Sequence, residues 1–315
     1  MNIVFAGTPE PAVVALARLL DSEHNVVGVI TRPDAPRGRG RTLHPSPVAA
    51  FAAEHGLQVW RPENLDPKQA ATQELLAELK ALDVQCIPVV AYGQLLRQEV
   101  IDAIEYGWLN LHYSLLPQWR GAAPVQAAIQ AGQKETGVSV FRIDSGLDTG
   151  DILGQATAEI RPTDTADELL TRLSYQGADL LVEVLDAIAA GTAVARPQAG
   201  DPSYASKITT ADARIDWEQP AANVDQHIRA MTPGPGAWTM WGERRVKITG
   251  PAVPTEQGAQ LAPGEVHISK QEVLVGTASS AVALTHLQLP GKKRMNAADW
   301  ARGLQPADKE GMQWQ

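Results

Sequence analysis

Cysteine and long hydrophobic runs are almost absent from this chain of 315 residues. The single cysteine, Cys86, cannot form an internal disulfide, and its place in an apolar run favours a core residue over a nucleophile. No stretch is long and apolar enough to span a membrane, and the opening MNIVFAG has neither a basic leader nor a cleavage site. We therefore expect a soluble cytoplasmic protein that does not bind membranes.

Two phosphate-binding motifs are also missing. The turn Gly7-Thr8-Pro9-Glu10 after the first apolar run lacks the three spaced glycines of a dinucleotide fingerprint, and no Gly-x-x-x-x-Gly-Lys run occurs. A nicotinamide-dependent oxidoreductase and a nucleoside-triphosphate enzyme are therefore poorly supported. Because no close cluster of His and Cys has metal-ligand spacing, no metal is expected.

Positive charge is scarce overall, since the formal net charge is −9. That balance argues against indiscriminate nucleic-acid binding, so the placement of basic residues matters more than their number. Basic residues gather in the loop Arg32–Arg41, with four arginines against one aspartate, and in two later groups, Arg244, Arg245 and Lys247, and Lys292, Lys293 and Arg294. Each group is either a solvated surface or a site for a polyanion such as RNA.

The first half of the chain alternates strand-like and helix-like patterns. Strands are predicted at Asn2–Ala6, Asn25–Thr31, Gln58–Trp60, Val84–Val90, Gly107–His112 and Ile152–Ile160. Helices are predicted at Pro11–Leu20, from the N-cap Ser46, at Lys68–Leu82, Gln94–Ile104 and Thr165–Ala190. Such alternation indicates an α/β domain with a mostly parallel sheet covered on both faces. Pro88 lies inside one of these strands and predicts an irregular ladder there.

The last third of the chain has a different pattern. Residues 191–208 are polar and contain Pro197 and Pro202, which indicates a linker or strap. A helix at Ala221–Met231 and short strands with glycine turns follow, and this succession suggests a small β-barrel. The short strands are predicted at Trp238–Trp241, Arg245–Ile248, Gly264–Ile268, Glu272–Gly276 and Val282–Leu289. We therefore predict one domain over 1–190, a linker over 191–208 and a second domain over 209–315.

One segment, Leu109–Asp151, combines groups suited to carbonyl chemistry. Asn110 and His112 lie two residues apart near the end of a predicted strand, and Asp148 lies in a loop between two glycines. An amide donor, a titratable ring and a carboxylate can together stabilise and deprotonate a tetrahedral intermediate. A lone histidine there would more often be structural, but an amide on the same side of the strand favours a site. Trp119 follows in the next loop and is a candidate for the wall of the site.

Several motifs together resemble the bacterial methionyl-tRNA formyltransferases over most of the chain. They are NLHYSLLPQWRGAAPVQAAI, GLDTGD, FAGTPE, RPDAPRGRGRTLHPSPV, VVAYG, ARIDW and PGAW. The Asn-His-Asp set is shared by the wider group of folate-dependent formyltransferases and specifies chemistry more than substrate. The arginine loop, ARIDW and the C-terminal region are what point to tRNA. Tyr113, where many relatives have glycine, would narrow the pocket beside His112, and Pro88 interrupts a strand that is usually plain and apolar.

The resemblance implies a Rossmann-like domain followed by an OB-like β-barrel domain that binds tRNA. It also implies 10-formyltetrahydrofolate as formyl donor and initiator methionyl-tRNA as acceptor, for translation initiation. Asn110, His112 and Asp148 would be catalytic: Asn110 donates to the oxyanion, His112 donates to it or moves the amine's proton, and Asp148 sets the imidazole tautomer. The other implied site residues are Val90, Ala91, Tyr92, Gly93, Ser114, Leu115, Leu116 and Pro117 for folate, and Arg37, Arg39, Arg41, Arg244, Arg245 and Lys247 for tRNA. Arg39 would contact the acceptor stem.

Two other functions stay open at this point. A related formyltransferase would act on the amine of a nucleotide sugar or a small ribonucleotide. An RNA-binding protein that has lost catalysis is also compatible with the basic groups, although the complete set of Asn110, His112 and Asp148 speaks against it. For the leading function we expect a monomer without a metal ion.

Overall fold

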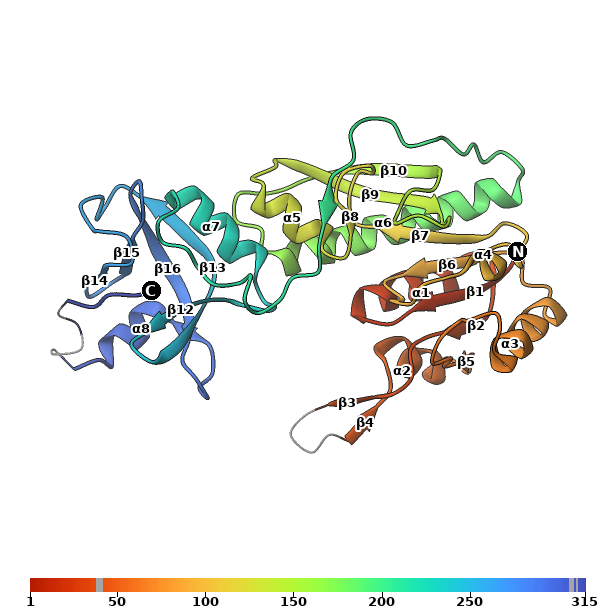
Figure 1. Ribbon diagram of the computed structural model, residues 1–315, viewed down its shortest axis with the longest axis horizontal. Helices are drawn as coiled ribbons and strands as arrows, with labels where there is room; N and C mark the ends of the chain where they lie inside the picture. Colours follow the sequence, from red (N-terminus) through yellow and green to blue (C-terminus); the bar gives the residue numbers. More distant parts are fainter. Residues whose placement is uncertain (38–41, 306–308, 310) are drawn as a thin grey trace. The chain divides into compact units, whose positions relative to one another are not determined.

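The structure is a computed structural model that describes residues 1–37, 42–305, 309 and 311–315. The chain forms two compact units, which Figure 1 shows coloured along the sequence. The first unit comprises residues 1–121, 136–158 and 170–204, and the second comprises residues 122–135, 159–169 and 205–315. The domain boundaries that the sequence suggests, at residues 190 and 208, stay a prediction.

A seven-stranded sheet organises the first unit, in the order β10-β9-β7-β6-β1-β2-β5. Its strands are β1 Asn2–Gly7, β2 Asn25–Ile30, β5 Gln58–Trp60, β6 Ile87–Val90, β7 Trp108–His112, β9 Glu135–Arg142 and β10 Ile152–Glu159. The five strands from β7 to β5 pair in parallel, whereas β9 runs antiparallel to β7. The predicted α/β domain with a mostly parallel sheet is confirmed.

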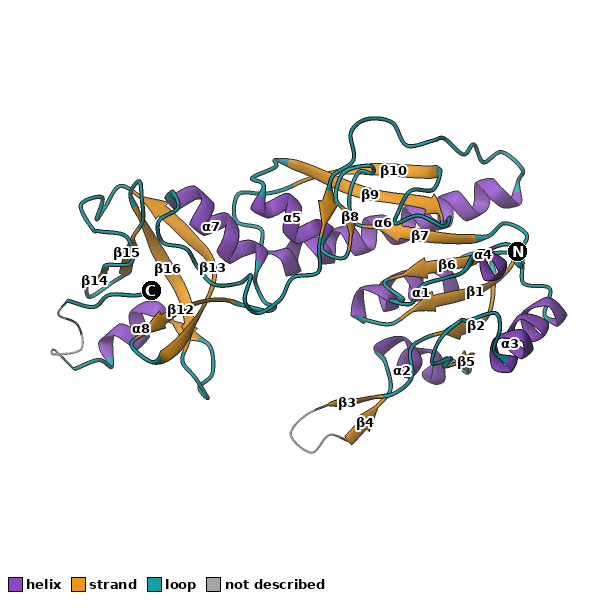
Figure 2. Ribbon diagram, viewed as in Figure 1, coloured by secondary structure: helices purple, strands orange, loops and turns teal. Residues whose placement is uncertain are grey.

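Helices cover both faces of this sheet (Figure 2). They are α1 Glu10–Leu20, α2 Pro47–Glu54, α3 Ala70–Ala81, α4 Gln98–Ile101 and α6 Ala166–Ala189. On one face Arg18 of α1 pairs with Asp179 of α6 at 2.7 Å, and Gly177 of α6 lies against Leu111 of β7. On the other face α3 and α4 share a core with alternate residues of β1 and β6, namely Val4, Ala6, Leu75, Leu79, Ile87, Val89, Val100 and Ile101. Within the described residues no helix is long and apolar enough to cross a membrane.

Helix α4 is much shorter than the predicted Gln94–Ile104. The Gln94 side chain donates to the carbonyls of Pro62 and Glu63 at 2.9 and 3.2 Å, and Gly93 has a φ of 79°. A left-handed residue and a side chain bound to a distant segment both keep the chain extended here. The helix therefore begins only after Arg97.

Pro88 lies in the central strand β6 and interrupts its ladder on one side. Ile87 donates to Gly107 on the β7 side, so alternation turns the nitrogen of Pro88 toward β1. There β1 pairs with β6 only through Ala6 and Gly7, apart from one bridge to Cys86. The predicted irregularity is therefore present. Cys86 itself is buried, and this burial raises the pKa of its thiol to about 12, as expected of a core residue.

The arginine loop is more ordered at its base than the sequence suggests. Strands β3 Ala35–Arg37 and β4 Thr42–His44 pair antiparallel, from Ala35 with His44 to Arg37 with Thr42. Gly38 and Gly40 in the sequence favoured an irregular loop throughout, because runs of three residues are too short to show strand alternation. Arg39 and Arg41 lie outside the described residues.

The second unit contains an antiparallel sheet in the order β12-β13-β16-β15-β14, and β17 pairs with β16. Its elements are α5 Pro124–Gln130, α7 Ala221–Ala230, β12 Ala237–Trp241, β13 Arg244–Thr255, β14 Val266–Ile268, β15 Val273–Gly276, β16 Ala281–Gln288, β17 Met295–Asn296 and α8 Ala297–Arg302. The C-terminal residues pair with both edges of this sheet. Gln315 exchanges hydrogen bonds with Met240 of β12, and Val266 of β14 donates to Met312.

Candidate active site

Strand β7 presents Asn110 and His112 on one face, because residues two apart in a strand point the same way. Asn110 is half-buried, and no described residue hydrogen-bonds to its side-chain amide. His112 is the last residue of the strand and only 6% exposed. Asn110 lies in register with Val89 of β6, so the turn Val90–Gly93 leaves the sheet directly beside these two side chains.

Two contacts define the state of the His112 ring. Its Nε2 lies 2.9 Å from the carbonyl oxygen of Trp119, and because a carbonyl can only accept, Nε2 carries the proton. The Nδ1 atom faces the carboxylate of Asp148 at 3.8 Å, which is too long for a hydrogen bond. Burial lowers the pKa of His112, and the Asp148 charge opposes that shift. The sequence suggested that Asp148 sets the tautomer, whereas the structure assigns this to the Trp119 carbonyl.

The loop that carries Asp148 is fixed by its own residues. Gly121 donates its N–H to Asp148 Oδ2 at 2.7 Å, and Asp144 accepts from Gly146 and from the Thr149 hydroxyl at 3.0 and 2.6 Å. A Cβ at Gly150 would lie 1.7 Å from the carbonyl oxygen of Arg142, so only glycine fits there. The motif GLDTGD thus reflects packing as well as the carboxylate.

Trp119 and Asp148, which touch opposite nitrogens of the His112 ring, both have left-handed backbones. Their φ angles are 59° and 52°. A non-glycine residue in this region costs on the order of 1–3 kcal/mol and persists only where its surroundings hold it. Such positions are typical of functional sites, and here the backbone sets both contacts of the imidazole.

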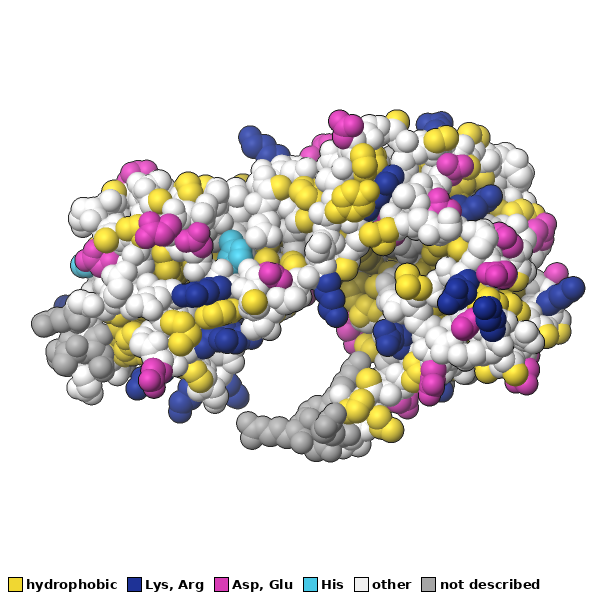
Figure 3. Space-filling view, viewed as in Figure 1, with side chains coloured by type: hydrophobic (Ala, Val, Ile, Leu, Met, Phe, Trp, Pro, Cys, Tyr) yellow, Lys and Arg dark blue, Asp and Glu magenta, His cyan; other side chains and the backbone are white. Residues whose placement is uncertain are grey.

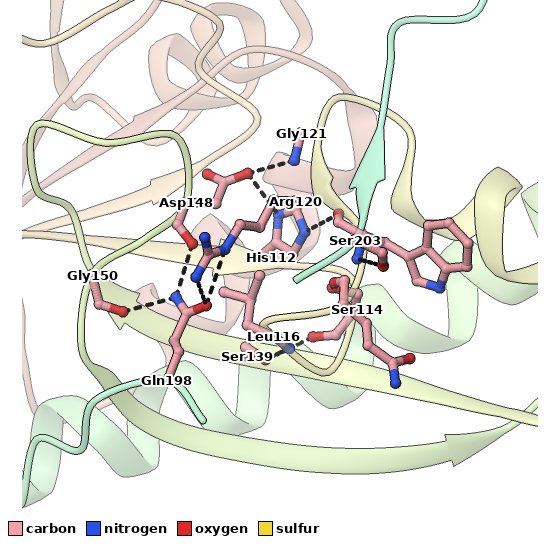
Figure 4. A network of polar contacts seen from close by, with 12 residues as sticks. His112, Ser114, Leu116, Arg120, Gly121, Ser139, Asp148, Gly150, Gln198 and Ser203 are labelled. Carbon is pink, nitrogen blue, oxygen red and sulfur yellow. Dashed lines mark hydrogen bonds and ion pairs between the residues drawn. The ribbon is translucent and has the colours of Figure 1, made fainter. Parts of the chain in front are cut away.

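Residues 191–204, which we call the strap, hold these two residues. The sequence indicated a linker or strap here, but sequence reasoning missed its contacts with the site. Gln198 donates to the carbonyls of Asp148 and Gly150, and the Ser203 hydroxyl accepts from the Trp119 N–H. Figure 4 shows Gln198 between Asp148, Gly150 and Arg120. One sequence signal was available, because both strap residues directly follow a proline in the run RPQAGDPS.

The expected folate-pocket residues Ser114–Pro117 form a turn that the sheet supports from below. Ser139 of β9 donates to the Ser114 carbonyl and accepts from the Leu116 N–H, and Gln155 of β10 donates to the Leu116 carbonyl. The Ser114 hydroxyl donates to the Gln118 carbonyl at 2.5 Å. Ser114, Leu116 and Pro117 are buried and Leu115 is half-buried, so these side chains shape the turn more than they face solvent.

The second expected pocket segment, Val90–Gly93, is held by other loops. Thr8 donates to the Tyr92 carbonyl at 3.1 Å, and Arg32 donates to the Gly93 carbonyl at 3.2 Å. Val90 and Tyr92 are buried, and Tyr92 packs in the core under α3 and α4. Only Ala91 and Gly93, whose φ angles are 47° and 79°, are exposed beside Asn110.

Tyr113 does not point at His112. Because it follows His112 in the chain, its side chain takes the opposite face, where its hydroxyl meets Ser174 of α6 at 3.4 Å. Burial raises the pKa of Tyr113 to about 12. The prediction that Tyr113 narrows the pocket beside His112 is therefore wrong, because its side chain packs against α6.

Arginines of the second unit stack on tryptophans of β12. Arg245 lies 4.2 Å and Arg214 5.7 Å from the ring centre of Trp238, and Arg244 lies 5.3 Å from that of Trp241. Figure 3 shows several Lys and Arg side chains at the surface of this unit. Lys247 instead donates to the carbonyl of Pro235 at 2.8 Å and is half-buried. Of the first-unit arginines expected to bind tRNA, Arg37 ends β3, and Arg39 and Arg41 are not described.

Among the described residues, no group of three or more His, Cys, Asp or Glu side chains that could hold a metal ion was found. Beside β7 the structure brings together an amide donor, an imidazole whose Nδ1 makes no hydrogen bond, and a carboxylate. These groups suit proton transfer and oxyanion stabilisation.

Comparisons with known proteins agree with this chemistry. Residues 1–185 match the family model "Formyl transferase", and residues 207–305 match "Formyl transferase, C-terminal domain". The chain is 57% identical to a methionyl-tRNA formyltransferase of Corynebacterium diphtheriae, covering 97% of each chain. It is 52% identical to one of Mycolicibacterium gilvum, covering 98% of each.

Solved structures share the fold at low identity. A Helicobacter canadensis N-formyltransferase in complex with folinic acid and dTDP-3-aminofucose is 18% identical, with a TM-score of 0.68 over 93% of this chain and 99% of that one. A methionyl-tRNA formyltransferase from Clostridium thermocellum is 14% identical, with a TM-score of 0.56 over 92% and 98% of the two chains.

Proposed function

The chain belongs to the formyl transferase family, within its methionyl-tRNA formyltransferases, and on this basis we propose that it transfers the formyl group of 10-formyltetrahydrofolate to the α-amine of initiator methionyl-tRNA. The reaction is an acyl transfer that serves translation initiation. Full-length relatives that are 57% and 54% identical carry this activity in their names. A formyltransferase for a nucleotide-sugar amine is the weaker candidate, because its named representative shares only 18% identity.

In the proposed reaction a bond forms from the methionyl nitrogen to the formyl carbon, the bond to N10 of the folate breaks, and one proton passes from the amine to N10. Asn110 supports the first step, because its unpartnered side-chain N–H can donate to the oxygen on which charge develops. One such preorganised donor is worth about 3–4 kcal/mol of barrier.

The arrangement of His112 carries the proposal most directly. Since the Trp119 carbonyl holds the proton on Nε2, Nδ1 is the nitrogen available to take the amine's proton and deliver it to N10. Such proton transfer contributes on the order of a hundredfold to ten-thousandfold. The carboxylate of Asp148, 3.8 Å from Nδ1, would stabilise the imidazolium that forms.

The formyl donor would lie along the turns Val90–Gly93 and Ser114–Pro117, where Ala91, Gly93 and Leu115 are the accessible residues. Exposed backbone of two turns beside Asn110 suits a flat heterocycle that binds through hydrogen bonds to main-chain groups. In the second unit we propose an OB-like barrel that binds tRNA. The C-terminal pairing with β12 and β14 and the arginines on Trp238 and Trp241 support this proposal.

A monomer in the cytoplasm completes the proposal. The initiator form of the tRNA is proposed from the relatives' activity and not from a contact.

A formylation assay with the purified protein, 10-formyltetrahydrofolate and labelled initiator methionyl-tRNA tests this function. We expect formylmethionyl-tRNA as product and no transfer to an amino sugar nucleotide or a small ribonucleotide amine. Asn110→Ala, His112→Ala and Asp148→Asn should each lower the single-turnover rate about a hundredfold or more. Asp151→Asn, which alters an exposed carboxylate of the same loop, is the matched control and should stay near wild type. Formyl transfer to one of the small amines, and not to methionyl-tRNA, would refute the proposal that methionyl-tRNA is the acceptor.

A further inference from the structure

Most residues of the strap are exposed to solvent, and only a few of its side chains contact the rest of the first unit. Of residues 191–204, only Ala193, Gln198 and Ser203 are not exposed. Beyond its start at the end of α6, backbone hydrogen bonds hold the strap at two places. Arg196 exchanges two with Ile152, and Ser203 donates to the carbonyl of Pro117 and accepts from the Arg120 N–H. The second place lies at the end of the turn Ser114–Pro117. The two polar strap side chains that turn inward are therefore anchored next to the candidate active site.

Each of these side chains clamps one of the two left-handed residues that touch His112. Ser203 Oγ accepts the Trp119 N–H at 2.9 Å, and the carbonyl of Trp119 in turn accepts from His112 Nε2. Gln198 Nε2 donates to the carbonyl of Asp148 at 2.8 Å, and the carboxylate of Asp148 faces Nδ1 of the same ring. Each of the two residues that contact the His112 ring is thus hydrogen-bonded to one strap residue.

Gln198 also links the two clamped segments to each other. Its Oε1 accepts from Arg120 Nε and Nη2 at 3.2 and 2.7 Å, and its Nε2 reaches the Gly150 carbonyl at 2.9 Å. Between those segments Gly121 donates to the Asp148 carboxylate. The side-chain amide of Gln198 therefore closes a ring of contacts that runs from Arg120 through Gly121 and Asp148 back to itself (Figure 4).

We propose that Gln198 and Ser203 are positioning residues for formyl transfer, which act by holding Asp148 and Trp119 against the imidazole of His112. The inference rests on the proposed function. A residue that fixes a catalytic group affects the rate more than substrate binding, because small displacements of reacting groups are costly in the transition state. The strap thus affects the rate through the residues that it holds against His112.

Substitutions in the strap separate positioning from a general structural role. In single-turnover formyl transfer, Gln198→Ala should lower kcat about tenfold to a hundredfold with little change in KM for either substrate. Gln198→Glu keeps acceptors for Arg120 but removes the donors to the Asp148 and Gly150 carbonyls, so it should be at least as slow. Ser203→Thr retains a hydroxyl and should be faster than Ser203→Ala. Val194→Ala, at an exposed strap position, is the matched control and should equal wild type.

A double-mutant cycle gives the decisive result. If Gln198 acts through Asp148, Gln198→Ala should change kcat by less than about twofold in an Asp148→Asn background. Independent, multiplicative losses would overturn the proposal, and so would a rise in KM at unchanged kcat.

A proton NMR measurement tests the clamp without turnover. The ring Nε2–H of His112, assigned by its loss in His112→Ala, should shift or exchange faster in Ser203→Ala. An unchanged signal would refute the clamp on Trp119. If the wild-type protein fails to formylate methionyl-tRNA while this signal responds as expected, the proposed function fails and the clamp stands.

Discussion

At the scale of single residues, His112 shows how backbone geometry can control an imidazole. Its two ring nitrogens meet a carbonyl and a carboxylate, and both partners come from residues with positive φ. Main-chain conformation thus places both partners of the ring, and of these three groups only the imidazole itself lies on a strand. Side-chain identity at Trp119 matters little for this contact, because its carbonyl does the accepting.

The titration of His112 follows from this setting. Burial lowers its pKa below the ordinary 6.5, so the ring is neutral at pH 7 and free to accept a proton. Because Asp148 raises that pKa, Asp148→Asn should lower it further. A histidine NMR titration, with His112→Ala for assignment, measures both values. A His112 pKa above 6.5, or a rise in Asp148→Asn, would contradict this account.

The same shift links pH to stability, with a defined sign. Between the lowered folded pKa and 6.5, the unfolded chain binds a proton that the folded one does not. The contribution of His112 is therefore fully present above about pH 6.5 and is lost as the pH falls through that range. His112→Ala should flatten this part of the stability profile.

At the scale of elements, strand pairing in the second unit builds the arginine and tryptophan face. β12 and β13 place Trp238 opposite Lys247 and Met240 opposite Arg245 in register. Since alternate residues share a face, Trp238, Met240, Arg245 and Lys247 lie on the same side of the ribbon. Stacking on an indole holds a guanidinium flat while its N–H groups remain available to phosphates.

Arg245→Ala should weaken binding of methionyl-tRNA and reduce the slope of log affinity against log salt by about one, because one phosphate contact is lost. Arg245→Lys keeps the charge and should restore most of the slope. Filter binding at several salt concentrations measures it. Arg18→Ala serves as the control, since this arginine of the first unit is paired with Asp179. The same slope in Arg245→Ala and wild type would exclude Arg245 from the interface.

At the scale of the whole molecule, the chain's last residues complete the second unit. Trp314 is 1% exposed and packs at 6.2 Å from Trp217 and 6.0 Å from Trp300 between ring centres. Its neighbour Gln315 pairs with β12, and Met312 pairs with β14. The sheet therefore depends on residues far along the sequence from the strands whose edges they meet.

Trp314→Ala should lower the free energy of unfolding of the second unit by about 3–5 kcal/mol, because it leaves a large cavity in this cluster. Hydrogen exchange of β12 and β14 amides reports this loss without requiring the whole chain to unfold in one step. Gln313→Ala removes only an exposed hydrogen bond, from its side-chain amide to the Pro263 carbonyl at 2.7 Å, and should cost no more than about 1 kcal/mol. Protection equal to wild type in Trp314→Ala would show that the tail does not support the sheet.

The sequence by itself determined most of the local elements and the family, although not the length of α4 or the β3–β4 pair. The N-cap Ser46 and the capping box of Thr165 with Glu168 are present as predicted, and so is the α/β alternation. These features depend on residues within one helical turn or one strand, so hydrophobic periodicity and capping residues suffice to predict them from the sequence. The motifs around Asn110, His112 and Asp148 also indicated formyl chemistry before any geometry was known.

Only the tertiary structure decided how that chemistry is held. The proton on Nε2 of His112, the face taken by Tyr113, and the strap contacts of Gln198 and Ser203 all depend on where distant backbone runs. Gln198 lies 78 residues from Arg120 and Ser203 lies 84 residues from Trp119 along the chain. No local pattern encodes such pairings, because their geometry exists only after the sheet has brought the loops together.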